Sequence, residues 1–239
     1  MLSPLGKLWF SIEIARFSAV ASLKIKGDKS ILEPPSLIEE NRLGSEGYKL
    51  IAGIDEAGRG ALAGPVVAAA VILPQFANFP WLNLVRDSKE IPPAKREFLF
   101  GLIQEEAIAV GIGIVPPQLI DLIGILNATK VAMCRAVEQL AYLPDFLLID
   151  YLTLPQLRIS QKGITRGDRL CLSIACASII AKVTRDRIMV ELDRLYPNYG
   201  LAHHKGYGTK QHSSCLCQLG PLPIHRYSFA PVREVAEVR

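Results

Sequence analysis

The order of apolar and polar residues along the chain predicts a sheet followed by helices. Three runs rich in Val, Ile and Leu have the composition of β-strands, and they are Tyr48–Ile54, Val66–Leu73 and Ile108–Val115. A glycine-punctuated connection separates the first two runs, and Pro116 and Pro117 end the third. We expect these three runs to form an antiparallel meander.

Apolar residues at helical spacing predict three helices, at Glu97–Glu106, Ala128–Leu140 and Ser173–Tyr196. Before the third of them, Phe146–Ile149 is short and wholly apolar, which is typical of a strand buried on both faces. This order of elements favours an α/β fold in which one mixed sheet is flanked by helices.

The N-terminal segment differs from the rest of the chain. Its apolar residues are scattered, and it ends at the consecutive prolines Pro34 and Pro35. We expect residues 1–35 to be a poorly ordered extension and residues 36–239 to form the folded domain. A helix is expected to begin after Ser36, with Ser36 as its cap.

Composition excludes some classes of protein. The chain has 239 residues, of which 50% are hydrophobic and 21% charged, so wholesale disorder is excluded. The longest uncharged stretch, Ala61–Val85, contains prolines and polar residues, so no membrane helix is predicted. Five cysteines without a paired C-x-x-C spacing argue against a zinc site or a disulfide framework and fit a reducing cytoplasm.

Charge is distributed unevenly. The whole chain carries a formal net charge of +4, but Gln156–Arg239 carries +7 and the preceding residues −3. A basic C-terminal portion predicts an anionic partner, for which nucleic acid is the commonest candidate. A solvated basic face is the alternative.

Four carboxylates stand out by position. Asp55 and Glu56 follow the first predicted strand, Asp150 follows the buried strand, and Asp168 precedes the long helix. Adjacent strands would bring Asp55 and Asp150 close together, where a divalent cation relieves their repulsion, and oxygen ligands select Mg²⁺ or Mn²⁺. Two such ions can hydrolyse a phosphodiester. The alternative is that Asp55 begins a turn and Asp168 caps a helix.

The loop Gly58-Arg59-Gly60 follows these carboxylates. Glycine lets the backbone approach a sugar or phosphate closely, so the loop could test for the 2′-hydroxyl that distinguishes RNA from DNA. The alternative is a loop that needs a positive φ angle.

Several motifs together carry a specific resemblance. They are IAGIDEAGRG (51–60) with LAGPVV (62–67), DSK (87–89), ASIIAKVTRD (177–186), HKGYGT (204–209), and HR (225–226) with SFAPV (228–232). In order and spacing these motifs resemble those of bacterial ribonuclease HII, and the match extends from about Ser36 to Arg233.

The resemblance implies a ribonuclease H-like fold, a mixed sheet flanked by helices with a helical C-terminal portion. It implies a metal-dependent endoribonuclease that uses Mn²⁺ or Mg²⁺ and cleaves the RNA strand of RNA–DNA hybrids. It also implies nicking of duplex DNA on the 5′ side of a single embedded ribonucleotide, leaving 5′-phosphate and 3′-hydroxyl ends. We expect a cytoplasmic monomer without a membrane partner.

The resemblance also implies roles for individual residues. The catalytic, metal-binding residues would be Asp55, Glu56, Asp150 and Asp168. Substrate would be bound by the backbone of Gly58, Arg59 and Gly60, which contacts the 2′-hydroxyl, and by Tyr207, which stacks on the sugar beyond the RNA-to-DNA junction. We expect Lys89, Lys182 and Lys205 to contact phosphates, since backbone neutralisation supplies most affinity for nucleic acid.

Other polar residues are expected to be structural. Asp186 lies well inside the predicted long helix, where Lys182 at i−4 is a candidate ion-pair partner. The histidines of the later motifs lie in turn and tail segments, so we expect structural or phosphate-facing roles rather than a metal site.

The chain departs from the family pattern at four positions. Tyr151 follows Asp150 at a position where the family usually has glycine. Arg166 stands where lysine is usual, Ala61 where proline is common, and Gly124 where asparagine is common. Tyr151 bears most on the geometry of the site, because it is bulky and adjacent to a predicted metal ligand. No carboxylate is lost, so activity is expected.

Two other functions compete with this one. A catalytically silent hybrid-binding module would be favoured only if a carboxylate were missing. A ribonuclease H-like nuclease acting on DNA junctions is disfavoured by the glycine loop and Tyr207, which by resemblance recognise a ribose beside DNA.

Overall fold

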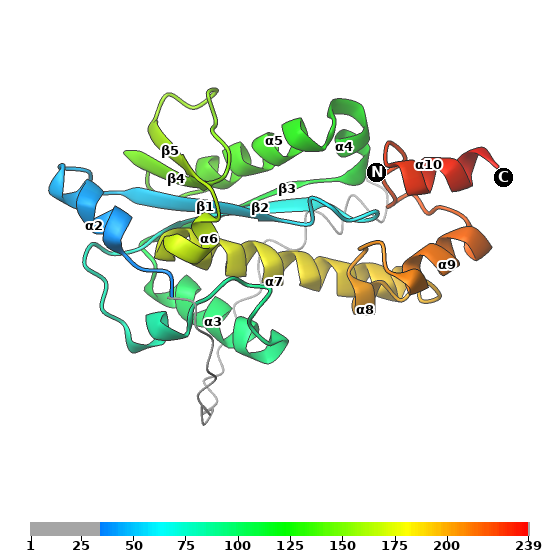
Figure 1. Ribbon diagram of the computed structural model, residues 1–239, viewed down its shortest axis with the longest axis horizontal. Helices are drawn as coiled ribbons and strands as arrows, with labels where there is room; N and C mark the ends of the chain where they lie inside the picture. The colour runs from blue at the N-terminus through cyan, green and yellow to red at the C-terminus, as the bar shows by residue number, and fades with distance from the viewer. Residues whose placement is uncertain (1–33, 239) are drawn as a thin grey trace. The chain divides into compact units, whose positions relative to one another are not determined.

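The computed structural model describes residues 34–238, and a mixed five-stranded sheet lies at its centre (Figure 1). The strands are β1 (Ile51–Ala57), β2 (Val66–Ile72), β3 (Ala109–Val115), β4 (Phe146–Asp150) and β5 (Ser160–Ile164). Their order in the sheet is β3-β2-β1-β4-β5. The strands β1, β2 and β3 pair antiparallel, whereas β4 pairs parallel to β1 and to β5. The predicted meander and the mixed sheet are therefore confirmed.

Helices cover both faces of the sheet. They are α2 (Ile38–Ser45), α3 (Pro93–Glu106), α4 (Pro117–Ile123), α5 (Ile125–Glu138), α6 (Gly167–Leu170), α7 (Leu172–Leu195), α8 (Leu201–His204), α9 (Lys210–Leu219) and α10 (Ala230–Glu237), with a 3₁₀ helix at Pro80–Leu84. Figure 1 shows α7 and α3 on one face and α4 and α5 on the other. The short helices α8, α9 and α10 follow α7, which confirms the helical C-terminal portion.

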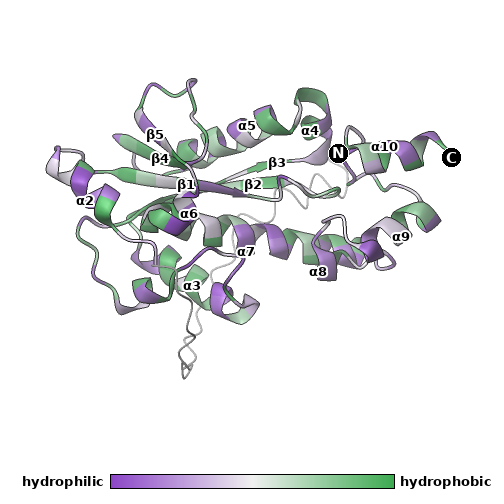
Figure 2. Cartoon of the chain, in the orientation of Figure 1, coloured by the Kyte–Doolittle hydropathy of each residue, from purple (hydrophilic) through white to green (hydrophobic). Residues whose placement is uncertain are grey.

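Each face of the sheet has its own hydrophobic core. Apolar residues of α3 and α7, such as Leu99 and Ile180, pack with Val71 on one face. Residues of α5, such as Met133, pack with Ile54 on the other. Every residue of β2 is buried, and Figure 2 shows the central strands largely in the hydrophobic colour. Burial on both faces explains why the sequences of these strands are continuous apolar runs.

A close contact fixes α7 against β1. A Cβ atom at Gly53 would lie 2.2 Å from the backbone carbon of Ser173, so only glycine allows the helix to begin there. This contact places the N-terminal turns of α7 beside the segment of β1 that carries Asp55.

The boundaries of some elements in the structure differ from the predicted ones, because strand pairing extends them. The first strand continues through Asp55 and Glu56 to Ala57, so the expectation that both carboxylates follow the strand was wrong. Pairing of these two residues with Ala69 and Ala68 of β2 keeps the chain extended. The edge strand β5 was not predicted, because its sequence SQKGI has no apolar run.

The N-terminal expectations had mixed outcomes. The expected Ser36 cap was wrong, because α2 begins at Ile38 after Leu37, and the Ser36 N–H donates to the carbonyl of Leu170 at 3.0 Å. The predicted extension, residues 1–35, lies outside the described residues except for Pro34 and Pro35. Within residues 34–238, no helix is long and apolar enough to cross a membrane.

Candidate active site

Strand pairing places two of the predicted carboxylates side by side. The parallel register of β1 and β4 pairs Ile54 with Ile149, so Asp55 and Asp150 occupy neighbouring positions of the sheet. The Oδ1 atom of Asp150 accepts a hydrogen bond of 2.7 Å from the N–H of Gly167, the first residue of α6. This contact brings the beginning of α6, and with it Asp168, to the end of β4.

The charges of the four carboxylates act on one another. Burial raises the pKa of Asp55 well above its usual value, and the charges of Glu56 and Asp150 raise it further. Burial and the charge of Asp150 raise the pKa of Glu56. Burial also raises the pKa values of Asp150 and Asp168, and the charge of Asp150 adds to the shift at Asp168. The predicted set is therefore one electrostatically coupled cluster.

This donor chemistry fits a hard divalent cation. All four side chains offer oxygen ligands, and a cation would neutralise the repulsion that raises their pKa values. Within residues 34–238, however, no three Asp, Glu, His or Cys side chains already converge as a metal ligand set. Asp55 Oδ1 accepts from the N–H of Glu56 at 2.7 Å, and Asp150 Oδ1 is bound to Gly167. Each of these carboxylates keeps its other oxygen and a second lone pair for a bound cation, so the hydrogen bonds can orient the ligands.

A fifth carboxylate, Asp87, was missed as a site residue. Its side chain is buried, and after burial its charge is the next cause that raises the pKa of Asp168. Its Oδ1 atom accepts a 3.0 Å hydrogen bond from the N–H of Lys89, and its Oδ2 lies 3.4 Å from Nη2 of Arg169. The motif DSK contains Asp87, but nothing in its spacing shows that this loop folds against the strands.

Lys89 lies in the field of the same cluster. Burial opposes its charge, but the neighbouring carboxylates, Asp87 and Asp55 first among them, outweigh that effect and raise its pKa. The ammonium of Lys89 therefore stays charged beside the carboxylates.

The two glycines of the Gly58-Arg59-Gly60 loop have different surroundings. Gly58 has a φ angle of +91°, and an added Cβ would lie 1.9 Å from Nε of Arg185. Gly60 has no positive φ angle, and its added Cβ would meet no atom of the described residues within 4 Å. Protein packing therefore requires glycine at position 58 but not at position 60.

Two buried arginines hold this loop. Both Arg185 and Arg226 have no exposed surface, and their donors go to backbone carbonyls. Arg226 donates to the carbonyls of Gly58, Arg59 and Gly64 at distances between 2.7 and 3.0 Å. Burial lowers the pKa of Arg226 to about 9. Sequence reasoning missed both residues, because buried arginine is rare and its carbonyl partners leave no pattern in the sequence.

Arg185 also connects the loop to Tyr207. Arg185 donates to the carbonyls of Ala63 and Pro65, and to that of Lys205 at 2.9 Å. Its guanidinium carbon lies 5.2 Å from the centre of the Tyr207 ring. The structure therefore brings Tyr207 and the glycine loop, which are far apart in the sequence, onto one support.

The other predicted lysines have structural partners. Lys182 Nζ lies 2.6 Å from Oδ1 of Asp186, which confirms the expected ion pair, and Asp186 also lies 3.6 Å from Arg96. Lys205 Nζ donates to the carbonyl of Ala202 at 2.6 Å. Neither contact tests the predicted phosphate-binding role.

Two departures from the family pattern lie in the left-handed region. Tyr151 has a φ angle of 61° and Arg166 of 58°. A left-handed residue after Asp150 gives a physical reason for the usual glycine there, since glycine adopts this conformation without steric cost. Tyr151 is 65% exposed.

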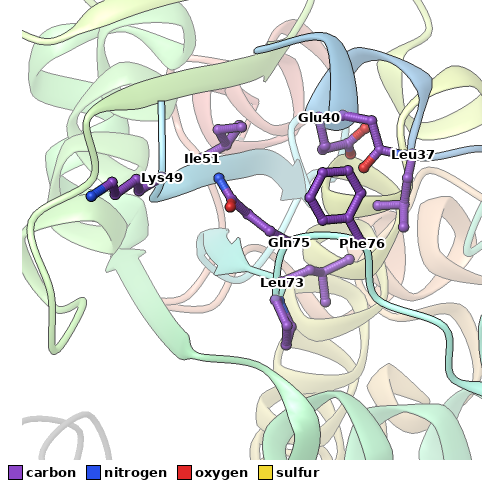
Figure 3. A pocket seen from close by; sticks show the side chains of 9 residues that line it. Leu37, Glu40, Lys49, Ile51, Leu73, Gln75 and Phe76 are labelled. Carbon is purple, nitrogen blue, oxygen red and sulfur yellow. The ribbon is translucent and has the colours of Figure 1, made fainter. Parts of the chain in front are cut away.

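A small cavity lies elsewhere, near the start of β1 and the end of β2 (Figure 3). Its volume is about 10 Å³, which is room for about one water molecule. Glu40, Lys49, Ile51 and Phe76 are among its lining residues. Because Ile51 is at the opposite end of β1 from the carboxylates, this cavity is separate from the candidate site.

Comparisons with known proteins show which proteins this chain resembles. A family model described as "Ribonuclease HII" matches residues 52–232. A protein named Ribonuclease HII from Dehalococcoides mccartyi (strain BAV1) is 57% identical over 199 residues, covering 83% of this chain and 94% of the relative. Another from Geobacter sulfurreducens is 54% identical over 195 residues, covering 82% and 88%.

Solved structures show the same fold. Ribonuclease H2 from Pyrococcus horikoshii OT3 superposes with a TM-score of 0.65 at 26% identity, covering 79% of this chain and 97% of that one. A structure of Bst-RNase HIII in complex with Mn²⁺ has a TM-score of 0.59 at 18% identity, covering 89% and 77%, and supports the fold alone.

Proposed function

The chain belongs to the ribonuclease HII family, and from that premise we propose how this endonucleolytic ribonuclease recognises and cuts its substrate. The family acts on RNA–DNA hybrids and uses divalent metals. We propose that this chain also nicks duplex DNA on the 5′ side of a single ribonucleotide, leaving 5′-phosphate and 3′-hydroxyl ends. The observation that carries the proposal is the carboxylate cluster, together with a glycine loop bound by Arg226 and an aromatic ring that lies over Arg185.

We propose that Asp55, Glu56, Asp150 and Asp168 hold Mg²⁺ or Mn²⁺. When bound, two such ions activate a water and stabilise the leaving oxygen of a phosphodiester. The burial of Asp55 and Asp168 keeps competing water away from these oxygens. The Gly167 N–H orients the carboxylate of Asp150 from one side.

Recognition of the ribose is assigned to the loop and Tyr207. The backbone of Gly58, Arg59 and Gly60 would contact the 2′-hydroxyl, and the open space above Gly60 leaves room for the sugar. The ring of Tyr207 would pack on the next deoxyribose. Lys89, Lys182 and Lys205 would contact phosphates, and the last two belong to the positively charged C-terminal portion.

Substitution of Asp150 by Asn tests the catalytic assignment. Cleavage of duplex DNA with one ribonucleotide is measured with Mg²⁺, with Mn²⁺ and with a chelator. We expect the variant to lose turnover while still binding the duplex, because affinity comes mainly from phosphate contacts. A variant that keeps more than about a tenth of the wild-type rate, a barrier change under ~1.4 kcal/mol, would contradict the role.

Substitution of Tyr207 tests the junction assignment. Tyr207→Ala is expected to reduce cleavage at a lone ribonucleotide more than cleavage within a long RNA stretch, where the next sugar is a ribose. Tyr207→Phe is the milder control, because it keeps the ring face. Both substrates are compared at one salt concentration. Equal losses on the two substrates would mean that Tyr207 only packs.

A further inference from the structure

Three buried histidines form a cluster that contacts the backbone of Tyr207. The exposed fractions of His204, His212 and His225 are 5%, 0% and 1%. The rings of His204 and His212 stack with centroids 4.3 Å apart, and the Nε2 atoms of His212 and His225 lie 3.0 Å apart. None of the three has a place in the mechanism proposed above.

Hydrogen-bond partners fix the proton positions on two of these rings. The N–H of Leu222 can only donate, and it points at Nδ1 of His225 at 2.9 Å. A neutral His225 therefore carries its proton on Nε2 and donates it to Nε2 of His212. His212 must then carry its proton on Nδ1, which lies 3.0 Å from the carbonyl oxygen of Tyr207. The chain of donors runs from Leu222 through two rings to Tyr207.

The third ring has a determined tautomer as well. The N–H of Gly206 points at Nδ1 of His204 at 3.1 Å, so His204 carries its proton on Nε2 and donates it to the carbonyl of Tyr199 at 2.8 Å. Each histidine thus has one donor and one acceptor contact, which only a neutral imidazole can make.

The cluster holds the backbone of Tyr207 from several sides. The carbonyl of Tyr207 accepts from His212 Nδ1 and, at 2.8 Å, from the N–H of Thr209. The N–H of Tyr207 donates to the carbonyl of His204 at 3.0 Å. On the other side of the residue, the ring lies over Arg185. The position of the ring therefore depends on this backbone anchor.

We propose that His212, with its tautomer set by His225, is a positioning residue that holds Tyr207 at the RNA-to-DNA junction. This inference rests on the proposed function, in which Tyr207 packs on the deoxyribose. Each imidazole must be neutral, because one of its nitrogens accepts a hydrogen bond. Burial favours this state, since it lowers the pKa of His212 and lowers that of His225 to about 4.

The test compares three substitutions by kcat/KM on two substrates. His212→Phe keeps a ring but removes the donor to Tyr207, and His212→Asn keeps an amide N–H near the Nδ1 position. His203→Phe, at an exposed histidine on α8, is the matched control. The substrates are duplex DNA with one ribonucleotide and a continuous RNA–DNA hybrid.

We expect His212→Phe to lose about threefold to tenfold more activity on the lone ribonucleotide than on the hybrid, the size of one hydrogen bond. His212→Asn should recover most of that difference, and His203→Phe should show none. In a Tyr207→Ala background, His212→Phe should cause no further selective loss, because both changes act through one residue.

The outcomes separate the inference from the proposed function. If Tyr207→Ala is selective but His212→Phe is not, or if their selective losses add, the positioning role is overturned and the junction role stands. If Tyr207→Ala is not selective, the junction role fails and the inference fails with it.

The histidine tautomers can also be measured on the wild-type protein, so this test does not depend on the folding of a variant. Nitrogen-15 NMR of the histidine rings at neutral pH should show the Nδ1–H tautomer for His212 and the Nε2–H tautomer for His204 and His225. An Nε2–H tautomer at His212 would overturn the inference, because Tyr207 would then have no imidazole donor.

Discussion

Gly58 and Gly60 show how two identical residues can serve different purposes. Gly58 is required by the fold, because its φ angle is positive and Arg185 occupies the space of a side chain. Gly60 is not required by any neighbour in the part of the chain that the structure describes. A glycine that packing does not explain is consistent with close approach of a substrate.

The Gly60→Ala variant should therefore fold normally and cut poorly. Its melting temperature should match that of the wild type, while cleavage at a lone ribonucleotide should fall at least about tenfold, or ~1.4 kcal/mol. The matched variant, Gly58→Ala, should lose stability by at least ~1–2 kcal/mol from its φ angle alone. Wild-type activity in Gly60→Ala would show that nothing approaches the backbone there.

Tyr151 carries backbone strain next to Asp150, one of the carboxylates proposed to bind metal. Its left-handed φ angle costs a residue with a Cβ about 1–2 kcal/mol, and its exposed ring contributes little packing. Tyr151→Gly should raise stability by up to ~1 kcal/mol, after the greater entropy of glycine in the unfolded chain is subtracted. Thermal unfolding should show a rise of about 2–4 °C per kcal/mol.

The control for this strain is Tyr151→Ala. Alanine removes the ring but keeps the Cβ, so it should give no stabilisation. An equal gain in both variants would trace the effect to the tyrosine ring rather than to the backbone.

At the scale of elements, Glu40 joins two helices across the sequence. Its Oε1 atom accepts from the N–H and the hydroxyl of Ser173 at 2.9 and 2.7 Å. No side chain caps α7 locally at Cys171, so a residue of α2 satisfies the first turn of the helix instead. This contact lies beside Gly53 and helps to hold the start of α7 next to the segment of β1 that carries Asp55.

Removal of this link should weaken the fold. Glu40→Ala leaves donors of Ser173 unpaired in a buried position and should cost ~1–3 kcal/mol, measured by urea unfolding. Glu40→Gln keeps an acceptor oxygen and should cost little. A small loss in Glu40→Ala would show that water replaces the carboxylate.

The pH dependence of Glu40→Gln has a definite sign. Burial raises the pKa of Glu40 above 4.5, so the folded state holds its proton more tightly than the unfolded state. As pH rises above 4.5, the contribution of Glu40 to the free energy of unfolding therefore falls. The stability of the glutamine variant should then rise relative to that of the wild type. The opposite trend between pH 4.5 and 7 would mean that Ser173 stabilises the ionised form.

At the scale of the whole molecule, one continuous domain holds the fold and the site. All strands of the described sheet, and all residues assigned to catalysis or recognition, lie between residues 51 and 226. We therefore propose residues 36–239 as the catalytic domain.

Deletion of residues 1–33 should leave cleavage and stability nearly unchanged. The deletion removes none of the contacts described for the sheet, the arginines or the histidine cluster. Cleavage of the lone-ribonucleotide duplex and the melting temperature are the measurements. A fall of more than about 4 °C, equivalent to at least ~1 kcal/mol, would show that the segment stabilises the domain.

The sequence alone determined the local features of this protein. Apolar runs and spacing predicted the meander, the buried strand and the long helix, because burial of one face leaves a periodic apolar pattern and burial of both faces leaves a continuous apolar run. Motifs identified the family, and residue type and position pointed to the four carboxylates and the glycine loop. These signals need only residues that lie close together in the sequence.

Only the tertiary structure decided which distant residues meet. The guanidinium of Arg226 binds the carbonyl of Gly58, and Asp87 joins the carboxylates from a loop with no periodic signal. The tautomer of His212 depends on His225 and on a backbone N–H. Several of these partners are backbone groups, which every residue has, and the others lie far away in the chain, so the sequence does not mark them. Packing alone brings them within hydrogen-bond distance, where burial favours the neutral imidazoles and the hydrogen-bond partners set their proton positions.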